Sequence, residues 1–177
     1  MTEPVRWLDP DERAAWHAFV IAGMHVFAAL DRDLRAALDV TLLDHAILLL
    51  LRDAPAPGLT MGHLAGLFGV ENSVITYRLQ RMEQRGLARR ERNQADKRLV
   101  HAVITPAGEA LCDAAGPVHV ASVRSRFLDH VPRPTLPVIA DVFGRLRAAQ
   151  RQRGAPDPRA DAPGPAAGPA GPGDRAG

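Results

Sequence analysis

Two short helices separated by a glycine-containing turn constrain this sequence more than any other feature. Thr60 is a favourable N-cap for the first helix, and Gly69 follows directly after its last turn. The second helix is predicted over residues 72–85 and stops before Gly86. Its inward apolar side chains are Ile75, Leu79 and Met82. Two helices arranged in this way predict a helix-turn-helix.

A β-hairpin is predicted immediately after these helices. Residues 88–92 and 99–104 flank the polar segment 93–98, and the second flank is strand-like because it is rich in valine and isoleucine. A hairpin in this position is a wing. We therefore expect a mainly α-helical fold with a small β-hairpin wing, that is, a winged helix-turn-helix joined to a helical dimerisation region.

A long apolar stripe precedes the predicted lobe. A helix is expected to begin at Asp9-Pro10, where a cap residue is followed by a first-turn proline. Its apolar residues recur at three- and four-residue steps from Trp16 to Leu38. One helix-turn-helix is too small to bury such a stripe, so the stripe predicts a homodimer.

The chain is expected to divide into an N-terminal dimerisation helix (1–40), a winged helix-turn-helix lobe (41–104), C-terminal dimerisation helices (105–152) and a tail (153–177). The C-terminal helices are predicted from Thr105 and Thr135, with Gly116-Pro117 as a candidate kink. The tail contains only Gly, Ala, Pro, Arg and Asp. Because it lacks the apolar surface that offsets chain entropy, we expect it to be disordered.

Charge is concentrated in one segment, although the whole chain carries a net charge of only +2. Residues 71–101 hold eight basic and four acidic side chains, so the remainder is slightly acidic. A basic helix and hairpin are typical of a surface that binds nucleic-acid phosphates. The alternative is a solvated arginine-rich face without a ligand.

Other classes of function find little support in the sequence. The single cysteine, Cys112, excludes an internal disulfide and fits a reducing cytoplasm, although a redox-sensing role for it stays open. Cys112 and His119 can share a helix face, but two ligands do not make a zinc site. The N-terminus has no secretory signal pattern, and we expect no membrane partner. We expect no cofactor, metal site or enzymatic activity, because no catalytic or cofactor-binding motif is present.

Several segments together resemble the MarR-type winged helix-turn-helix regulators over roughly residues 10–150. The segments are Leu64-Ala65, Ser73-Val74-Ile75-Thr76, Arg81-Met82-Glu83-Gln84-Arg85-Gly86-Leu87, Arg92, Asp96-Lys97-Arg98 and Thr105-Pro106-Ala107-Gly108. Glu71 and Tyr77-Arg78 depart from the residues usual in that family. The resemblance implies a cytoplasmic, sequence-specific transcriptional regulator, most often a repressor. It would bind a pseudo-palindromic operator in double-stranded DNA as a homodimer, and a small aromatic or phenolic effector would release it.

The second motif helix is the expected recognition helix, with polar side chains of a size that reaches base edges and phosphates in a major groove. Its predicted DNA-binding residues are Asn72, Ser73, Thr76, Tyr77, Gln80 and Arg81. In the family pattern the wing arginine enters the minor groove, which implies this role for Arg98, with Lys97 and Arg92 on phosphates. Asp96 is expected to orient one of these arginines, or to be a plain turn residue.

The family's effector pocket lies between the dimerisation helices and the DNA-binding lobe. The resemblance therefore implies an apolar pocket lined by Trp16, Phe19, Val20, Leu43 and Ile47. Trp16 and Phe19 also fit core or dimer contacts. The competing function is a winged-helix module that binds a protein partner and uses its arginines only for solubility.

Overall fold

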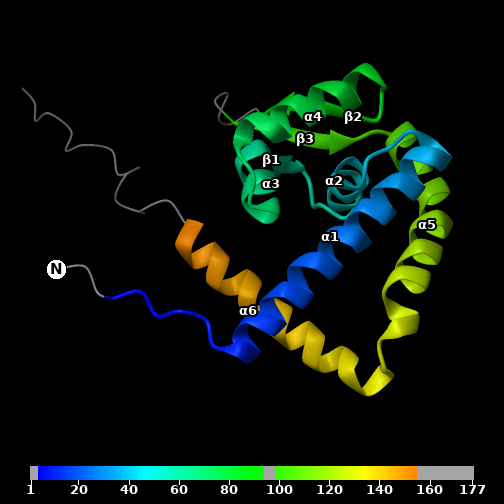
Figure 1. Cartoon of the computed structure of the whole chain (residues 1–177). Helices are drawn as coiled ribbons and strands as arrows, with labels where there is room; N and C mark the ends of the chain where they lie inside the picture. The colour runs from blue at the N-terminus through cyan, green and yellow to red at the C-terminus, as the bar shows by residue number, and fades with distance from the viewer. Residues whose placement is uncertain (1–3, 94–98, 155–177) are drawn as a thin grey trace, which may run out of the picture.

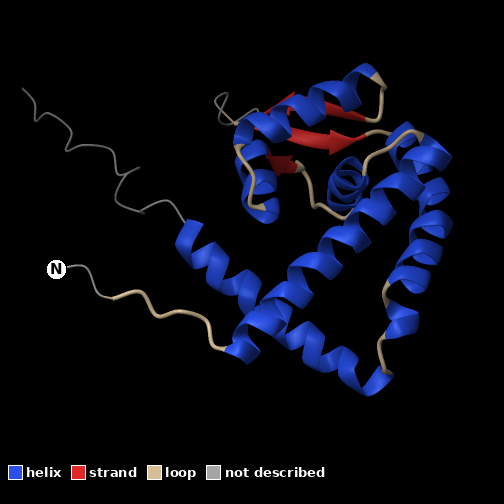
Figure 2. Cartoon of the chain, viewed as in Figure 1, coloured by secondary structure: helices blue, strands red, loops and turns tan. Residues whose placement is uncertain are grey.

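The structure, a computed structural model, describes residues 4–93 and 99–154. Its helices and strands are α1 (Pro10–Leu38), α2 (Leu42–Arg52), β1 (Leu59–Thr60), α3 (Met61–Phe68), α4 (Asn72–Gln84), β2 (Ala88–Arg92), β3 (Val100–Ile104), α5 (Pro106–Arg126) and α6 (Leu136–Gly154). Two short 3-10 helices connect α5 to α6. Figure 2 shows that helices dominate and that the strands lie together in one small sheet. The predicted mainly α-helical winged fold is confirmed.

The sheet has the strand order β1-β3-β2, and both pairings are antiparallel. β2 and β3 form the predicted hairpin, with Ala88 opposite Ile104. β1 was not expected, because two residues carry no alternating pattern that a sequence can show. Leu59 of β1 pairs with Ala102 of β3 and closes the sheet beside α3.

The helix starts follow the predicted caps. Asp9 and Glu12 form a reciprocal capping box at α1: each side chain accepts a hydrogen bond from the other residue's backbone N–H, at 2.8 and 3.0 Å. At α2, the Thr41 side chain accepts from the N–H of Asp44 at 3.0 Å. Gly69 ends α3 in the left-handed conformation that glycine adopts most readily.

The main core lies inside the winged lobe, between α2, α3, α4, the sheet and the first half of α5. Its fully buried members include Ile47, Leu48, Leu64, Ile75, Leu79 and Ala102. The inward positions predicted for the recognition helix are confirmed, because Ile75, Leu79 and Met82 are all buried. This core holds α4 with its opposite face toward solvent.

α1, α5 and α6 form an open frame outside the lobe (Figure 1). α1 packs on α5 near the lobe, where the Ser122 hydroxyl donates to Asp33 at 2.6 Å. α5 continues through Pro117, so the candidate kink at Gly116-Pro117 does not divide it. α6 ends at Gly154, so it includes the first two residues of the predicted tail, and residues 155–177 lie outside the described part of the chain.

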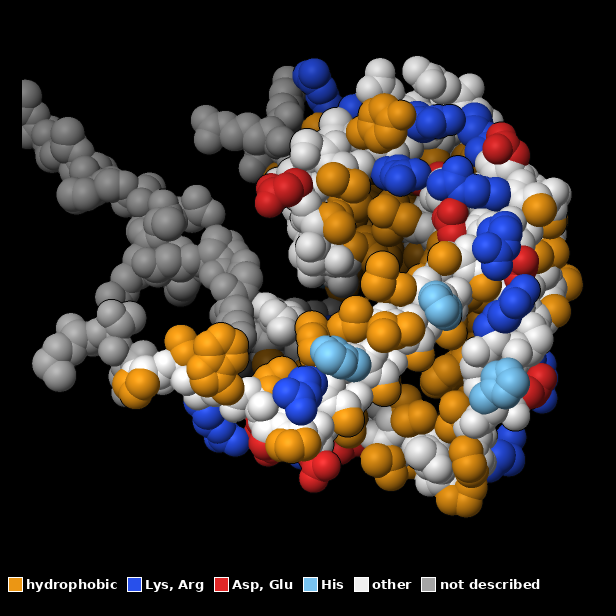
Figure 3. Space-filling model, in the orientation of Figure 1, with side chains coloured by type: hydrophobic (Ala, Val, Ile, Leu, Met, Phe, Trp, Pro, Cys, Tyr) orange, Lys and Arg blue, Asp and Glu red, His pale blue; other side chains and the backbone are white. Residues whose placement is uncertain are grey.

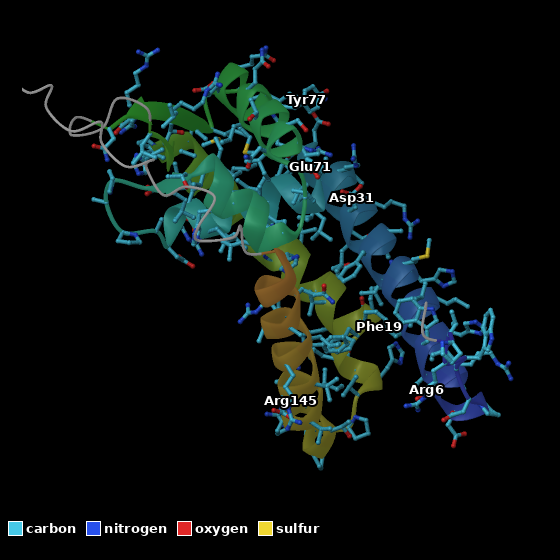
Figure 4. All side chains as sticks on the ribbon, turned by 90° about the vertical axis from the view of Figure 1, so that its left-hand side faces the viewer. Arg6, Phe19, Asp31, Glu71, Tyr77 and Arg145 are labelled. Atoms are coloured by element: carbon cyan, nitrogen blue, oxygen red, sulfur yellow. The ribbon has the colours of Figure 1, made fainter. Side chains whose placement is uncertain are left out.

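Much of the frame's apolar surface is exposed in the single chain. The residues are Trp16, Phe19, Ile21, Met24 and Phe27 of α1 and Val138, Val142, Phe143 and Leu146 of α6. The rings of Trp16 and Phe19 are in contact, and Phe19 also touches Phe143, with ring centroids 5.6 Å apart. α6 is therefore held against α1 by an aromatic cluster that has solvent on its outer side (Figure 4).

Candidate nucleic-acid interface

The outer face of α4 presents the side chains predicted to contact DNA. Asn72, Ser73, Thr76, Tyr77, Gln80 and Arg81 are all exposed. They lie opposite the buried stripe that packs into the lobe, since residues on one helix face recur at three- and four-residue steps. Their contacts with DNA stay a prediction, but the fold makes all six accessible to a ligand at once.

Two of these side chains are engaged locally within the helix. The Thr76 hydroxyl donates to the Asn72 carbonyl oxygen at 2.9 Å, which leaves its oxygen lone pairs directed outward as acceptors. Arg81 donates to the Tyr77 hydroxyl at 3.5 Å, and this contact raises the pKa of the fully exposed Arg81 guanidinium. Tyr77, which is 55% exposed, lies on the outer side of α4 (Figure 4).

Glu71 is the N-cap residue of α4, but its side chain makes no capping hydrogen bond. The resemblance had already marked this position as unusual, because a serine is common there. The first N–H groups of α4 therefore lack a side-chain acceptor from the cap residue, and N–H groups in that position are suited to a phosphate oxygen.

The basic segment consists of two groups of arginines with different surroundings. Three of them form ion pairs: Arg78 with Asp44, Arg89 with Glu91 and Arg90 with Glu83. A fourth, Arg85, donates a hydrogen bond to the Asp39 carbonyl oxygen. Arg81 and Arg92 are exposed and make no ion pair among the described residues. Figure 3 shows basic side chains gathered over the winged lobe, with acidic ones interspersed. Counting basic residues in the sequence therefore overstated the charge that is free to meet phosphate.

The tip of the wing lies outside the described residues, and with it the predicted roles of Asp96, Lys97 and Arg98. Arg92, the fourth wing residue of the prediction, is the last residue of β2 and pairs in register with Val100. Its exposed position at the end of the hairpin places it beside the wing tip.

Gln84 belongs to the same outer face and was missed by the sequence interpretation. It is exposed and follows Gln80 by four residues, one turn further along α4. The spacing was available as a signal.

The five predicted effector-pocket residues do not come together within one chain. Ile47 is fully buried in the lobe core, whereas Trp16 and Phe19 are about half exposed near the start of α1. Phe19 lies 19 residues before the end of α1 at Leu38, which is about 28 Å along a helix. The predicted pocket lined by all five residues is therefore wrong for this structure, because Ile47 is enclosed in the core while Trp16 and Phe19 lie near the far end of α1.

A shallow hollow does exist elsewhere in the frame, where α1 and α5 diverge. Its volume is about 360 Å³, and its lining residues are His25, Val26, Ala28, Ala29, Arg32 and Arg126. Arg126 also lies 3.6 Å from Asp33, so one of the cations at this hollow is partly neutralised.

Cys112 is almost fully buried, and burial raises the pKa of its thiol. A thiol in this setting resists ionisation, which disfavours the redox-sensing role that the sequence left open. Among the described residues, no three His, Cys, Asp or Glu side chains gather as a metal site.

Two histidines form an unusual buried contact between the lobe and the frame. The rings of His45 in α2 and His119 in α5 have centroids 5.0 Å apart. Both ring nitrogens of His45 and Nδ1 of His119 are buried without a hydrogen-bond partner in the described part of the chain. Burial first, and then the neighbouring His119 and Arg52, lower the pKa of His45 and favour its neutral form.

The protein has a winged helix-turn-helix fold, in which α3 and α4 form the helix-turn-helix and the β2–β3 hairpin forms the wing. The model of the MarR family matches residues 38–99, which include α2, α3, α4 and β2. This part of the chain is therefore similar to the MarR family of transcriptional regulators. The sequence matches none of the curated proteins.

Solved structures of MarR family regulators have the same fold. Sco3205 from Streptomyces coelicolor, in complex with DNA, is 24% identical with a TM-score of 0.78, over 84% of this chain and 92% of that one. AbsC from the same organism is 29% identical with a TM-score of 0.75, over 85% and 99%. CouR from Rhodococcus jostii RHA1, bound to p-coumaroyl-CoA, is 20% identical with a TM-score of 0.67, over 80% and 96%.

Proposed function

We propose that this protein is a MarR-type, sequence-specific DNA-binding regulator that inserts α4 into a major groove. The observation that carries the proposal is the outer face of α4, where six predicted contact residues are exposed together on a helix anchored by a buried core. Amide, hydroxyl and guanidinium groups at these positions match the donors and acceptors of base edges. Sco3205, which has this fold, was crystallised with DNA.

The proposed regulator works as a homodimer. The exposed apolar residues of α1 and α6 make a surface that a second copy of the chain would bury. By length and composition α1 could also cross a membrane, and within the described residues it is the one helix that could. A dimer interface explains the same apolar surface, and it is consistent with the proposed DNA-binding function of the lobe. Two-fold symmetry then predicts a pseudo-palindromic operator with half-sites about one helical turn apart.

More specifically, we propose that the protein is a cytoplasmic repressor whose DNA binding is controlled by a small effector molecule. The solved relative CouR binds p-coumaroyl-CoA, an aromatic thioester. Aromatic side chains at Trp16 and Phe19 offer apolar contact area for a ring. A ligand there releases DNA only if it prefers the arrangement of the two lobes that does not fit the operator.

Selection of bound sequences from a random duplex library tests the proposal. We expect an inverted repeat to emerge, and we expect affinity for it to fall steeply with salt, with a log-log slope of about −0.9 for each neutralised phosphate. A chain that enriches no sequence and shows a flat salt response is not a DNA-binding regulator. That outcome favours the protein-docking module as the alternative.

A further inference from the structure

Arg78 of α4 and Arg85, the C-cap residue of α4, make their contacts away from the outer face that is proposed to contact DNA. Arg78 and Arg85 are seven residues apart, which places them on one side of the helix beside the buried stripe. Both belong to the basic segment that the sequence assigned to phosphate binding. Their contacts instead run to the corner where α1 ends and α2 begins.

Arg78 reaches the first turn of α2. Its guanidinium lies 3.5 Å from the Asp44 carboxylate and donates to the Thr41 hydroxyl at 3.4 Å. The side chains of Arg78 and Asp44 are only 27% and 18% exposed. Asp44 Oδ1 is buried and makes no hydrogen bond in the described part of the chain, so its charge depends on Arg78 for compensation.

Arg85 lies at the C-terminal end of α4, where it is the C-cap residue. It donates to the Asp39 carbonyl oxygen at 2.7 Å. Asp39 is the C-cap of α1 and has a left-handed backbone with φ of 52°, a conformation that turns the chain sharply into α2. The two arginines thus attach the middle and the C-terminal end of α4 to one corner.

The corner itself is held by Asp31. Its carboxylate accepts from the backbone N–H of Leu42 at 2.8 Å and pairs with Arg35 at 2.5 Å. Burial opposes ionisation of Asp31, but the hydrogen bonds from Arg35 and Leu42 outweigh it and lower the pKa. Arg78 and Arg85 therefore attach α4 to a corner that Asp31 already holds together. Asp31 is labelled on α1 in Figure 4.

We propose that Arg78 and Arg85 are positioning residues that set the angle of the recognition helix against the α1–α2 corner, and that neither contacts phosphate. This inference rests on the proposed DNA-binding function. A guanidinium suits the task because its planar donors fix direction as well as distance. Loss of either contact removes one of the two polar attachments of α4 to this corner, and the apolar stripe defines the depth of the helix better than its rotation. Specific binding then weakens, while the charge on the outer face stays unchanged.

Salt dependence separates positioning from phosphate contact. Arg78→Gln and Arg85→Gln are compared on the selected operator and on random duplex, with Arg81→Gln from the outer face and Arg145→Gln from α6 as matched controls. Arg145 pairs with Asp141 inside its own helix. We expect the two positioning variants to lose about 2- to 30-fold in operator affinity, with an unchanged salt slope and unchanged random-duplex binding. Arg81→Gln should reduce the slope by about 0.9.

In Asp44→Ala, the direction of the change in operator affinity tests the inference. Removal of an acidic charge strengthens DNA binding if only the overall field matters, whereas loss of the Arg78 contact weakens operator binding. We expect weaker binding, and in the Asp44→Ala/Arg78→Gln double variant we expect a loss smaller than the product of the two single losses. Thermal unfolding of every variant, and titration of its active fraction, separate misfolding from misorientation.

The results distinguish the two levels of the proposal. If the wild-type chain selects no operator, the proposed function fails. If the wild type is specific but Arg78→Gln and Arg85→Gln each reduce the salt slope by about 0.9, the arginines contact phosphate and the inference is overturned. Tighter operator binding by Asp44→Ala overturns it as well.

Discussion

Gly108 of α5 lies directly against the backbone of Leu87, so that a Cβ at position 108 would fall 2.1 Å from the Leu87 carbonyl oxygen. The Thr105 hydroxyl donates to the Gly86 carbonyl oxygen at 2.6 Å and accepts from the Gly108 N–H at 3.1 Å. The Thr-Pro-Ala-Gly segment therefore caps α5 and joins it to the end of α4. In this way the frame is attached to the lobe.

Gly108→Ala should destabilise the fold, by about 1–3 kcal/mol or more, because the added methyl group meets backbone that cannot move aside. Gly116→Ala in the same helix is the matched control. No atom lies within 4 Å of its added Cβ, so we expect a gain of about 0.4–1 kcal/mol. The free energy of unfolding of both variants is measured in urea. Equal changes in the two variants would count against the close contact at Gly108.

Phe19→Asp should break the proposed dimer. A carboxylate on the exposed aromatic cluster would be buried without a partner if a second chain covers it. We expect light scattering to show a shift from dimer to monomer or to aggregate, whereas Ala114→Asp, an exposed position of α5, keeps the wild-type mass. A wild-type chain that is already a folded monomer at micromolar concentration would refute the dimer.

Gln80→Ala should relax base preference at one operator position by about 1–3 kcal/mol while sparing the rest. Arg92→Ala should instead weaken binding on all sequences and reduce the salt slope by about 0.9, as a phosphate contact does. Selection profiles of the two variants, together with affinities at several salt concentrations, make the comparison. Identical profiles would contradict the assignment of Gln80 to a base and of Arg92 to a phosphate.

Acidification should weaken the junction between α2 and α5 through His45. Its pKa is lower in the folded chain than its ordinary value of 6.5, so the unfolded chain binds the proton more readily. The stability is fully present above pH 6.5 and is lost as the pH falls from there through the folded pKa. Asp31 and Asp33 have lowered pKa values and lose their contribution only below their ordinary value of 3.8, in a separate window.

Urea midpoints measured between pH 5 and 8 test this dependence. His45→Phe retains a ring of comparable bulk and cannot be protonated, so its midpoint should vary less with pH than that of the wild type. His63→Gln, at an exposed position of α3, is the control and should follow the wild type. A wild-type midpoint that stays level from pH 7 to pH 5 would show that His45 does not couple folding to protonation.

An aromatic acid that acts as effector should quench or shift the fluorescence of Trp16 and lower operator affinity in the same titration. A hundredfold preference for the DNA-free arrangement corresponds to about 2.7 kcal/mol. Trp16→Phe identifies the reporting ring, since Trp7 is the other tryptophan and is far more exposed. Ligand binding without any change in operator affinity would rule out the switch.

Local features of this chain were predictable because each acts within one helical turn or one hairpin. The Asp9 and Thr60 caps and the stripe of Ile75, Leu79 and Met82 all appear in the structure as the sequence indicated. Hydrogen bonds of this kind join residues three or four positions apart, so sequence spacing alone specifies them.

Tertiary structure decided which basic residues face solvent and which apolar residues share a surface. Arg78 and Arg85 carry the same charge as Arg81, but their partners lie 34 and 46 residues away along the chain. Trp16 and Ile47 are both apolar, yet one lies on the exposed frame and the other in the lobe core. Charge and hydropathy are properties of single residues, whereas a partner 40 residues distant depends on how the helices pack. The spacing pattern along one helix contains no information about that packing.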